Sequence, residues 1–170
     1  MIYFTSDLHL GHENVIKFQN RPFADVNEMN RTLIINYNSI VQPNDDVYIL
    51  GDLAFRIPVE DANRIISKMN GKKYLITGNH DKQYDESLFE EITIYKEIKY
   101  CRERFVLMHY PLLEWRNMYH GSYHLHGHIH SFPDYNIKNK NDNIRRYDVG
   151  VDANYFYPIA ITDIINFFNN

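Results

Sequence analysis

The stretch IYFTSDLHLGH, residues 2–12, joins a short apolar run to a group of polar residues. Its first part is rich in β-branched and aromatic residues and predicts a buried strand near 2–6. Asp7 and His9 follow directly. In an extended segment, residues i and i+2 project to the same side, so we expect these two side chains to act as a pair. A carboxylate and an imidazole presented together suit metal chelation.

Two later stretches repeat this arrangement of a strand followed by a polar residue. The run DVYIL at 46–50 precedes Asp52, and KYLIT at 73–77 precedes Asn79. In α/β architectures, ligands collect outside the carboxyl ends of the strands. We therefore expect these polar side chains to converge with Asp7, although they lie far apart in the sequence.

Helical periodicity fills the gaps between these runs. Residues 26–40 place apolar side chains three and four positions apart, which predicts a helix with one buried face. Pro58 suits the first turn of a second helix, which we expect to continue to Met69. The alternation predicts a sheet covered by helices and therefore the α/β class.

The second half of the chain consists of short β-rich segments separated by turn-forming residues, and we expect a second, largely antiparallel sheet there. No linker rich in Gly, Ser or Pro interrupts the sequence, so both halves are expected to form one domain over residues 1–170. The Asn-rich run at 139–143 predicts a loop tip. The β-rich segments are ITIY at 92–95, EIKYC at 97–101, RFVLMHY at 104–110, SYHLHGHIH at 122–130 and RRYDVGVD at 145–152.

Composition and charge exclude several classes of protein. The chain has 18 Lys and Arg against 22 Asp and Glu, which argues against a surface that coats nucleic acid but leaves open a local site acting on it. The apolar run at the start has no basic leader and is broken by Asp7, so we expect a cytoplasmic protein that does not enter a membrane. The single cysteine, Cys101, is expected to pack, and it excludes an intramolecular disulfide and a cysteine-rich zinc site. Histidine and carboxylate remain as metal ligands.

Five short motifs carry residues suited to metal binding and proton transfer. Each motif alone is weak, because a single buried histidine is more often a hydrogen-bonded core residue than a ligand. The ordered set, with the motifs following strand-like segments, is specific. The motifs are SDLHLGH at 6–12, LGDLA at 50–54, TGNHD at 77–81, LMHYP at 107–111 and HGHIH at 126–130.

This set closely resembles the calcineurin-like metallophosphoesterase superfamily, whose pattern reads D-x-H, G-D, G-N-H-[D/E], H and G-H-x-H in this order. The match runs from Asp7 to His130. The stretch SDLHLGHENVIKFQNRPF at 6–23, together with VGVD at 149–152, also resembles the small, prophage-associated branch of that superfamily. The resemblance implies a four-layer αββα sandwich, in which two mixed β-sheets are flanked by helices.

The resemblance also implies a centre of two divalent ions with Asp52 as the bridging ligand. Carboxylate, amide and imidazole ligands together suit Mn, Fe, Ni, Zn or Co. Manganese is the expected metal, but these ligand types alone do not select it. Two such ions activate a water held between them and neutralise phosphate oxygens. His80 matches the family histidine that would donate a proton to the leaving oxygen or stabilise charge on the transition state. The implied ligands are Asp7, His9, Asp52 and His130 for the first ion, and Asp52, Asn79, His109 and His128 for the second.

Three further residues are candidates for substrate binding. His12 lies where the chain leaves the first strand and would line the substrate entrance, or would be a surface histidine at a helix start. Arg21 would pair with a phosphodiester. Arg56 matches the arginine of the phosphatase motif G-D-x-x-D-R-G, as a phosphate contact or as an ordinary surface arginine. Phe55 replaces the aspartate of that motif, which argues against a Ser/Thr phosphatase.

Several other polar residues have two interpretations each. Asp81 is expected to support a ligand or to cap the next helical stretch. His126 would orient a ligand through a hydrogen bond, and His124 would belong to the strand before it. Asp148 and Asp152, on either side of Gly150, would face the site, or turn chemistry around Gly150 would account for them, which is the favoured interpretation. Trp115 and Arg116 would contact a nucleotide, or Trp115 would simply pack.

These observations favour a metal-dependent phosphodiesterase acting on a small or nucleotide-like phosphoester, because little chain remains for a cap that would recognise a large partner. A phosphomonoesterase or a nuclease of the same chemistry is the alternative among enzymes. A non-catalytic scaffold on the same fold is disfavoured, because His80 and every ligand position are present. A structural zinc module would need four closed ligands, which this set does not fit. The sequence does not identify a protein partner.

Overall fold

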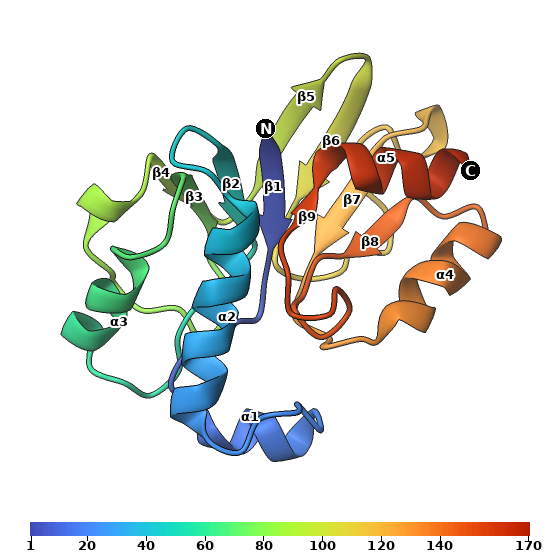
Figure 1. The fold of residues 1–170 in the computed structure, drawn as a ribbon. Helices are drawn as coiled ribbons and strands as arrows, with labels where there is room; N and C mark the ends of the chain where they lie inside the picture. Colours follow the sequence, from blue (N-terminus) through green and yellow to red (C-terminus); the bar gives the residue numbers. More distant parts are fainter.

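The computed structural model describes residues 1–170, which form two β-sheets packed face to face with helices on their outer sides (Figure 1). The first sheet has the strand order β4-β3-β2-β1-β9. Strands β1 to β4 are parallel, and β9 is antiparallel to β1, so the sheet is mixed. The strands are β1 (Ile2–Thr5), β2 (Asp46–Ile49), β3 (Lys72–Ile76), β4 (Glu91–Thr93) and β9 (Ile159–Ala160).

The outer face of this sheet is covered by α2 (Val26–Ile40) and α3 (Val59–Ile66), whose buried residues pack with those of the strands. The prediction for 26–40 is confirmed. Asp25 begins α2 by accepting hydrogen bonds from two free backbone N–H groups of the first turn. The second helix starts after Pro58 as expected but ends before Met69.

The second sheet has the order β5-β6-β7-β8 and is mixed, so the prediction of a largely antiparallel sheet is wrong. Only the hairpin of β5 with β6 is antiparallel. The long connection 108–122 returns the chain so that β7 runs parallel to β6. A helix after β7 does the same before β8. Crossover connections of this kind join parallel strands. The segment ITIY contributes to β4 of the first sheet instead. The strands are β5 (Lys96–Tyr100), β6 (Glu103–Leu107), β7 (Tyr123–His126) and β8 (Arg146–Asp148).

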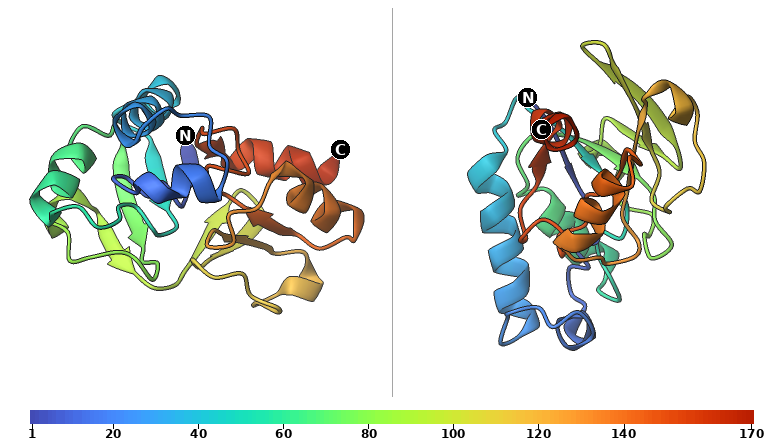
Figure 2. Two further views of the ribbon diagram at one scale, coloured as in Figure 1. Left: turned by 90° about the horizontal axis from the view of Figure 1, so that it is seen from below. Right: turned by 90° about the vertical axis from the view of Figure 1, so that its right-hand side faces the viewer.

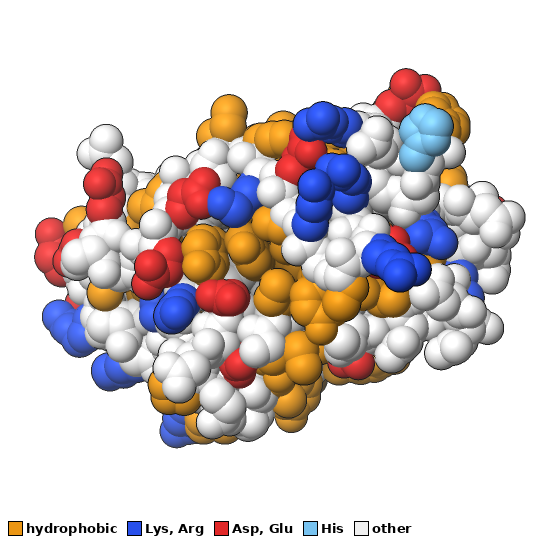
Figure 3. Space-filling model, turned by 90° about the horizontal axis from the view of Figure 1, so that it is seen from above, with side chains coloured by type: hydrophobic (Ala, Val, Ile, Leu, Met, Phe, Trp, Pro, Cys, Tyr) orange, Lys and Arg blue, Asp and Glu red, His pale blue; other side chains and the backbone are white.

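Aromatic rings fill the space between the sheets. Tyr74, Tyr48 and Phe4 stack in sequence on the first sheet, at centroid distances of 4.7 and 5.7 Å. Phe4 continues to Phe105 on the second sheet, and Phe105 stacks on Tyr123 at 4.8 Å. Burying large rings supplies much of the free energy that joins the sheets. Hydrophobic side chains also lie in a band across the upper face of the molecule (Figure 3).

The remaining helices pack against particular elements: α1 against α2, α4 against β8, and α5 against β1 and β9. The short α1 lies at the end of the molecule toward which β1 points, as the view from below shows (Figure 2). The Asn-rich run is not a loop tip throughout, because its first three residues, 139–141, complete α4. Cys101 is exposed in the turn between β5 and β6 and does not pack. No helix has the length and apolarity needed to cross a membrane. These elements are α1 (Glu13–Phe18), α4 (Pro133–Asn141), α5 (Ile161–Asn169) and the short 3₁₀ helices η1 (Glu86–Leu88) and η2 (Met118–His120).

Candidate active site

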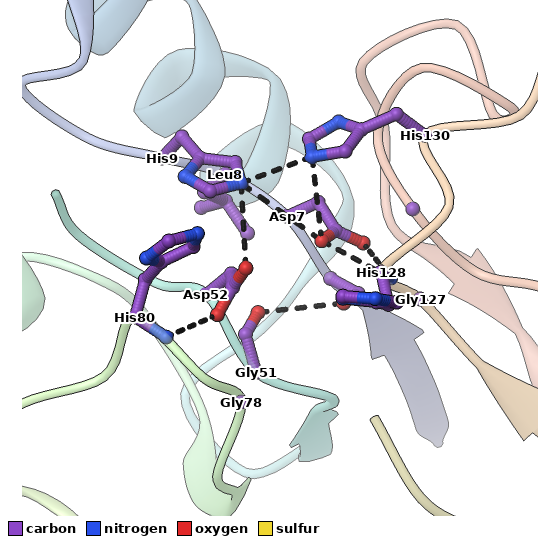
Figure 4. Close-up of polar contacts among 12 residues, drawn as sticks. Asp7, Leu8, His9, Gly51, Asp52, Gly78, His80, Gly127, His128 and His130 are labelled. Atoms are coloured by element: carbon purple, nitrogen blue, oxygen red, sulfur yellow. Dashed lines mark hydrogen bonds and ion pairs between the residues drawn. The ribbon is translucent and has the colours of Figure 1, made fainter. Parts of the chain in front are cut away.

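Two groups of acidic and histidine side chains meet beyond the carboxyl ends of β1, β2, β6 and β7 (Figure 4). Within each group, the atoms able to bind a metal all lie within 4.8 Å of one another. Residues more than 120 positions apart in the sequence thus share one site. The first cluster is Asp7, His9 and His130, and the second cluster is Asp52, His109 and His128.

Asp52 lies between the two clusters. Its Oδ2 is 3.5 Å from Nε2 of His9 in the first cluster and 3.5 Å from Nε2 of His109 in the second. This is where a bridging ligand would stand. Asn79 adjoins the second cluster, because its Oδ1 lies 3.1 Å from Nε2 of His109.

The hydrogen bonds of the imidazoles fit a site for cations. Nδ1 of His109 lies 2.7 Å from the carbonyl oxygen of Leu50, and Nδ1 of His130 lies 2.9 Å from a carboxylate oxygen of Asp152. Both partners only accept hydrogen bonds, so each Nδ1 carries a proton, and in the neutral ring each Nε2 presents a lone pair to the site. In this form the nitrogen lone pairs and the carboxylate and amide oxygens face and repel each other. A cation bound between them would remove that repulsion. Metal-bound histidines characteristically have such partners on the other ring nitrogen.

Burial makes the first cluster a poor place for uncompensated charge. Burial raises the pKa of Asp7 to about 8, against the opposing effect of His130. Burial, with smaller effects from His130 and Arg21, lowers the pKa of His9 to about 2. His9 is therefore neutral near pH 7, which is the form that binds a metal.

Five of the predicted ligands have a left-handed backbone. Their φ angles are between +47° and +72°, a region that residues other than glycine rarely adopt. The expectation that Asp7 and His9 project from an extended strand is therefore wrong, because β1 has ended and the chain turns sharply there. The same holds for His128 and His130, which follow β7. Strained backbone of this kind concentrates at functional sites. The five residues are Asp7, His9, Asp52, His128 and His130.

Two glycines allow the ligand segments to approach each other. A Cβ at Gly127 would lie 2.0 Å from Oγ of Ser6 and 2.3 Å from Oδ2 of Asp7. A Cβ at Gly78 would lie 2.4 Å from Oδ1 of Asp52. Neither position has room for a side chain, so glycine is required where these segments meet the carboxylates.

His80 lies beside the clusters with an exposed side chain. Its backbone N–H donates to Oδ1 of Asp52 at 2.9 Å, which fixes the residue to the proposed bridging ligand. Its ring centroid is 5.6 Å from that of His9. Phe55 contacts the His80 ring edge to face at 4.8 Å. His80 is thus accessible and held close to the place where ions would bind.

Next to His80 is a hollow of about 180 Å³ that involves two of the three predicted substrate-binding residues, His12 and Arg56. The ring of His12 lies 5.4 Å from that of His9. Burial, followed by the charges of His80 and Arg21, lowers the pKa of His12, so it would meet a phosphate as a neutral hydrogen-bond donor. The exposed guanidinium of Arg56 lies 5.0 Å from the ring centroid of Phe55.

The prediction that Arg21 contacts substrate is wrong, because its side chain is completely buried. Its guanidinium donates to both carboxylate oxygens of Asp152 and to the carbonyl oxygens of Asp7 and Leu8. A weaker contact reaches Sδ of Met29. All five N–H groups are used, so none remains for a phosphate.

Two carboxylates support the ligands: Asp152 differs from its favoured sequence-based interpretation, and Asp81 takes the supporting role that was one of its two alternatives. Asp152 contacts His130 directly, whereas the sequence favoured turn chemistry for it; the late VGVD was the available signal. Asp81 does not begin a helix. Its carboxylate accepts hydrogen bonds from the backbone N–H groups of Asp52, Leu53 and Gly78, and so supports the turn that carries Asp52.

The remaining candidates are structural. His126 is not bonded to a ligand side chain, because its nitrogens contact the carbonyl of Gly127 and the hydroxyl of Tyr135. His124 is enclosed beneath Trp115, whose Nε1 donates to Ser122. Trp115 therefore packs, and Arg116 pairs with Glu97 at the surface. Asp148 binds Ser131 and the N–H of Gly150, in agreement with the turn interpretation.

Comparison with known families shows to which family the chain belongs. The model of the family described as calcineurin-like phosphoesterase matches residues 1–158. The chain belongs to the calcineurin-like phosphoesterase family. The family resemblance expected from the motifs is confirmed. This family typically binds two divalent metals, and the structure has two clusters of Asp and His.

Other proteins of comparable size resemble the chain over nearly its full length. An uncharacterized protein of Methanocaldococcus jannaschii is 35% identical, with 96% of this chain and 89% of that protein covered. The gene 66 protein of Mycobacterium phage L5 is 29% identical, with 89% and 86% covered. A crystal structure of a protein of unknown function from Aquifex aeolicus is 29% identical and superposes with a TM-score of 0.78 over 98% of both chains. The predicted sandwich of two mixed sheets with flanking helices is confirmed.

Proposed function

We propose that this protein is a metal-dependent phosphodiesterase acting on small or nucleotide-like phosphoesters. The observation that carries the proposal is the pair of Asp and His clusters with Asp52 between them and the exposed His80 at their side. Family membership supports hydrolysis of a phosphoester. Seven residues fit the donor set of two divalent ions such as Mn, Fe, Ni, Zn or Co: Asp7, His9, Asp52, Asn79, His109, His128 and His130.

When bound, two such ions would supply an activated water and neutralise charge on the phosphate. The chain itself would supply the groups around them. His80 is placed to donate a proton to the departing oxygen, since its side chain is exposed and its backbone is fixed to Asp52. Phe55, which replaces the aspartate of the phosphatase motif, contacts the His80 ring without offering a hydrogen bond.

The available positive charge favours a diester over a monoester. A monoester carries a second negative charge near neutral pH, and a site selective for it benefits from additional cationic groups. Arg21 is unavailable because its donors are all used inside the protein. Arg56 is the guanidinium that borders the hollow beside His80. A singly charged diester matches this limited supply, and His12 would add a neutral donor.

The experiment compares diester and monoester hydrolysis after metal removal. The protein is stripped with a chelator and reconstituted with Mn, Ni, Fe, Zn or Mg singly. Hydrolysis of bis-p-nitrophenyl phosphate, p-nitrophenyl phosphate, dinucleotides and short oligonucleotides is then measured. We expect metal-dependent turnover with a higher kcat/KM for the diesters. A preference for p-nitrophenyl phosphate would support the phosphomonoesterase alternative, and activity confined to oligonucleotides would support a nuclease.

The variant His80→Ala tests the proton donor. We expect kcat to fall by about 10²- to 10⁴-fold for substrates with an alcohol leaving group. The loss should be much smaller for p-nitrophenolate, which leaves without a proton. His120→Ala is the matched control, because His120 is an exposed histidine in η2, outside both clusters. No turnover by the metal-loaded protein on any phosphoester would refute the enzyme proposal and favour a scaffold.

A further inference from the structure

A buried ion pair lies directly behind the first cluster. Nε of Arg21 is 2.8 Å from Oδ1 of Asp152, and Nη2 is 2.9 Å from Oδ2. The two side chains are 0% and 2% exposed. Burying two charges is costly unless each is fully hydrogen-bonded, and the double contact between a planar guanidinium and a carboxylate meets that need. The position of the pair indicates a role beyond stability.

Asp152 connects the ion pair to the ligand His130. The same oxygen that accepts from Nη2 of Arg21 lies 2.9 Å from Nδ1 of His130. A carboxylate at this position keeps the proton on Nδ1 and orients the ring, so that Nε2 points toward His9 at 3.1 Å and toward Asp7 at 3.8 Å. Asp152 therefore determines which nitrogen of His130 is free to bind an ion.

Arg21 also holds the other two ligands of this cluster. Its Nη2 donates to the carbonyl oxygen of Asp7 at 2.8 Å, and Nη1 donates to that of Leu8 at 3.0 Å. These carbonyls belong to the left-handed turn that carries Asp7 and His9. One guanidinium therefore joins the turn after β1 to the carboxylate that orients His130.

The second cluster is oriented differently. Nδ1 of His109 is held by the backbone carbonyl of Leu50, and Asp52 accepts from the backbone N–H of His80. Neither contact involves Arg21 or Asp152. The charged pair thus supports the first cluster alone, whereas backbone groups and Asp81 support the second. One contact joins the two clusters, because the backbone N–H of His128 donates to the carboxylate of Asp7.

We propose that Arg21 and Asp152 are positioning residues that set the affinity and geometry of the first metal site selectively. The inference rests on the metal centre of the proposed function. Loss of the partner that orients a metal-binding histidine typically weakens metal affinity by about 10- to 100-fold. For Asp152→Asn we therefore expect metal affinity to fall by about this factor at the first cluster and to stay unchanged at the second. Arg21→Lys, which keeps the charge but loses the planar double contact, is expected to weaken the first site less.

The test measures manganese binding rather than turnover. Calorimetric titration of the metal-free protein with Mn²⁺ gives the number of sites and their affinities, and electron paramagnetic resonance distinguishes a coupled pair of ions from a single ion. For wild type we expect two ions and a coupled spectrum. For Asp152→Asn we expect one ion at a concentration that fills both wild-type sites. In the zinc-loaded variant, imidazole ¹⁵N shifts of a metal-bound nitrogen at His109 and His128, but not at His9 and His130, would locate that ion in the second cluster.

Asp45→Asn is the matched control, because it breaks a charge-assisted bond to the amino group of Met1 at the opposite end of β1 and β2. It should bind both ions as wild type does. If Asp152→Asn also binds two ions with unchanged affinity, or loses both sites equally, the selective role is refuted while the metal centre stands. A wild-type protein that binds no metal would overturn the inference together with the proposed function.

A measurement on wild type keeps the inference testable even when Asp152→Asn does not fold. In the zinc-loaded protein, ¹⁵N spectra of the imidazoles distinguish a protonated Nδ1 from a metal-bound one. The inference requires His130 to carry a proton on Nδ1 and to bind zinc through Nε2. The opposite assignment would exclude the role given to Asp152.

Discussion

The ring of Phe55 stands at 89° to the ring of His80, with 4.8 Å between the centroids. The same phenylalanine contacts His12 at 4.0 Å and His9 at 6.0 Å. One apolar side chain thus contacts three histidines around the site. Because it offers no hydrogen bond, His80 is held by packing alone on this side and remains free to exchange a proton with substrate.

The variant Phe55→Leu should therefore slow catalysis without preventing metal binding. An edge-to-face aromatic contact contributes about 0.5–1.5 kcal/mol, which corresponds to about a 2- to 12-fold fall in kcat. We expect the fall to be larger for a diester with an alcohol leaving group than for bis-p-nitrophenyl phosphate, because only the former needs a proton. Phe167→Leu removes a comparable contact with Tyr147 far from His80 and is the control. Equal losses on both substrates would contradict the positioning role.

Arg56 is predicted to act on binding rather than on the chemical step. Its exposed guanidinium would contribute modestly to holding an anionic substrate, as exposed ion pairs do. For Arg56→Ala we expect KM to rise about 2- to 5-fold, with kcat nearly unchanged and a smaller effect at high salt. Steady-state kinetics at two ionic strengths measure both quantities. Arg64→Ala, at an exposed arginine of α3, is the control, and a rise in KM as large as that of Arg56→Ala would count against a specific contact.

Gly127→Ala should damage the first cluster through crowding. The new Cβ would lie within 2.3 Å of Oδ2 of Asp7, so the carboxylate must move. We expect a loss of about 1–3 kcal/mol in the free energy of unfolding, together with weaker Mn²⁺ binding. Urea unfolding and calorimetric titration measure the two effects. Gly121→Ala has a left-handed φ but meets no atom closer than 3.6 Å, so it should lose stability and keep both ions. Unchanged metal affinity in Gly127→Ala would show that the site tolerates the displacement.

His124 predicts how stability depends on pH. Burial, followed by the nearby His126, lowers its pKa to about 3, and its neutral ring accepts from the N–H of Leu112 while facing the carbonyl of Val106. The unfolded chain takes up a proton near pH 6.5 and the folded chain does not, so stability falls as the pH drops from 6.5 toward 3. Between pH 7.5 and 5.0 this contributes a loss of about 2 kcal/mol.

The variant His124→Gln lacks this titration. Its free energy of unfolding should be lower than that of wild type at pH 7.5, because packing is lost. The difference between the two proteins should then shrink by about 2 kcal/mol at pH 5.0. Urea unfolding followed by circular dichroism at both pH values checks this. A difference that stays constant would mean that folding does not lower the pKa of His124.

Local sequence patterns predicted the parts of the fold that depend on local physics. The helix at 26–40 was predictable because its apolar spacing and its capping Asp25 are both local. The direction of β7 was not predictable, because a parallel or an antiparallel pair buries the same alternating side chains. The long connection before β7 decides it, and its path depends on packing against the sheet.

The same distinction holds at the candidate site. The ligand residue types could be found in motifs, and their convergence followed from their positions at strand ends. Their left-handed backbone could not be foreseen from an apolar strand pattern. The pair of Arg21 and Asp152 was missed because its members lie 131 positions apart and each has an ordinary local explanation. Charged residues reveal such a pairing only when the fold brings them together.

The left-handed backbone at five of the ligands affects how this centre can change. Aspartate, asparagine and histidine are the residues that best tolerate such a conformation apart from glycine, and they are also the residues that bind these metals. Substitutions among these three residues keep the turns intact and alter the charge of the centre. Such substitutions can therefore change the metal preference with little loss of folding stability. Alanine at Asp7 or Asp52 removes a ligand and strains a turn together. Alanine substitution would therefore overstate how much metal binding contributes to stability. Asparagine removes the charge and keeps the turn, so it is the substitution that isolates this contribution.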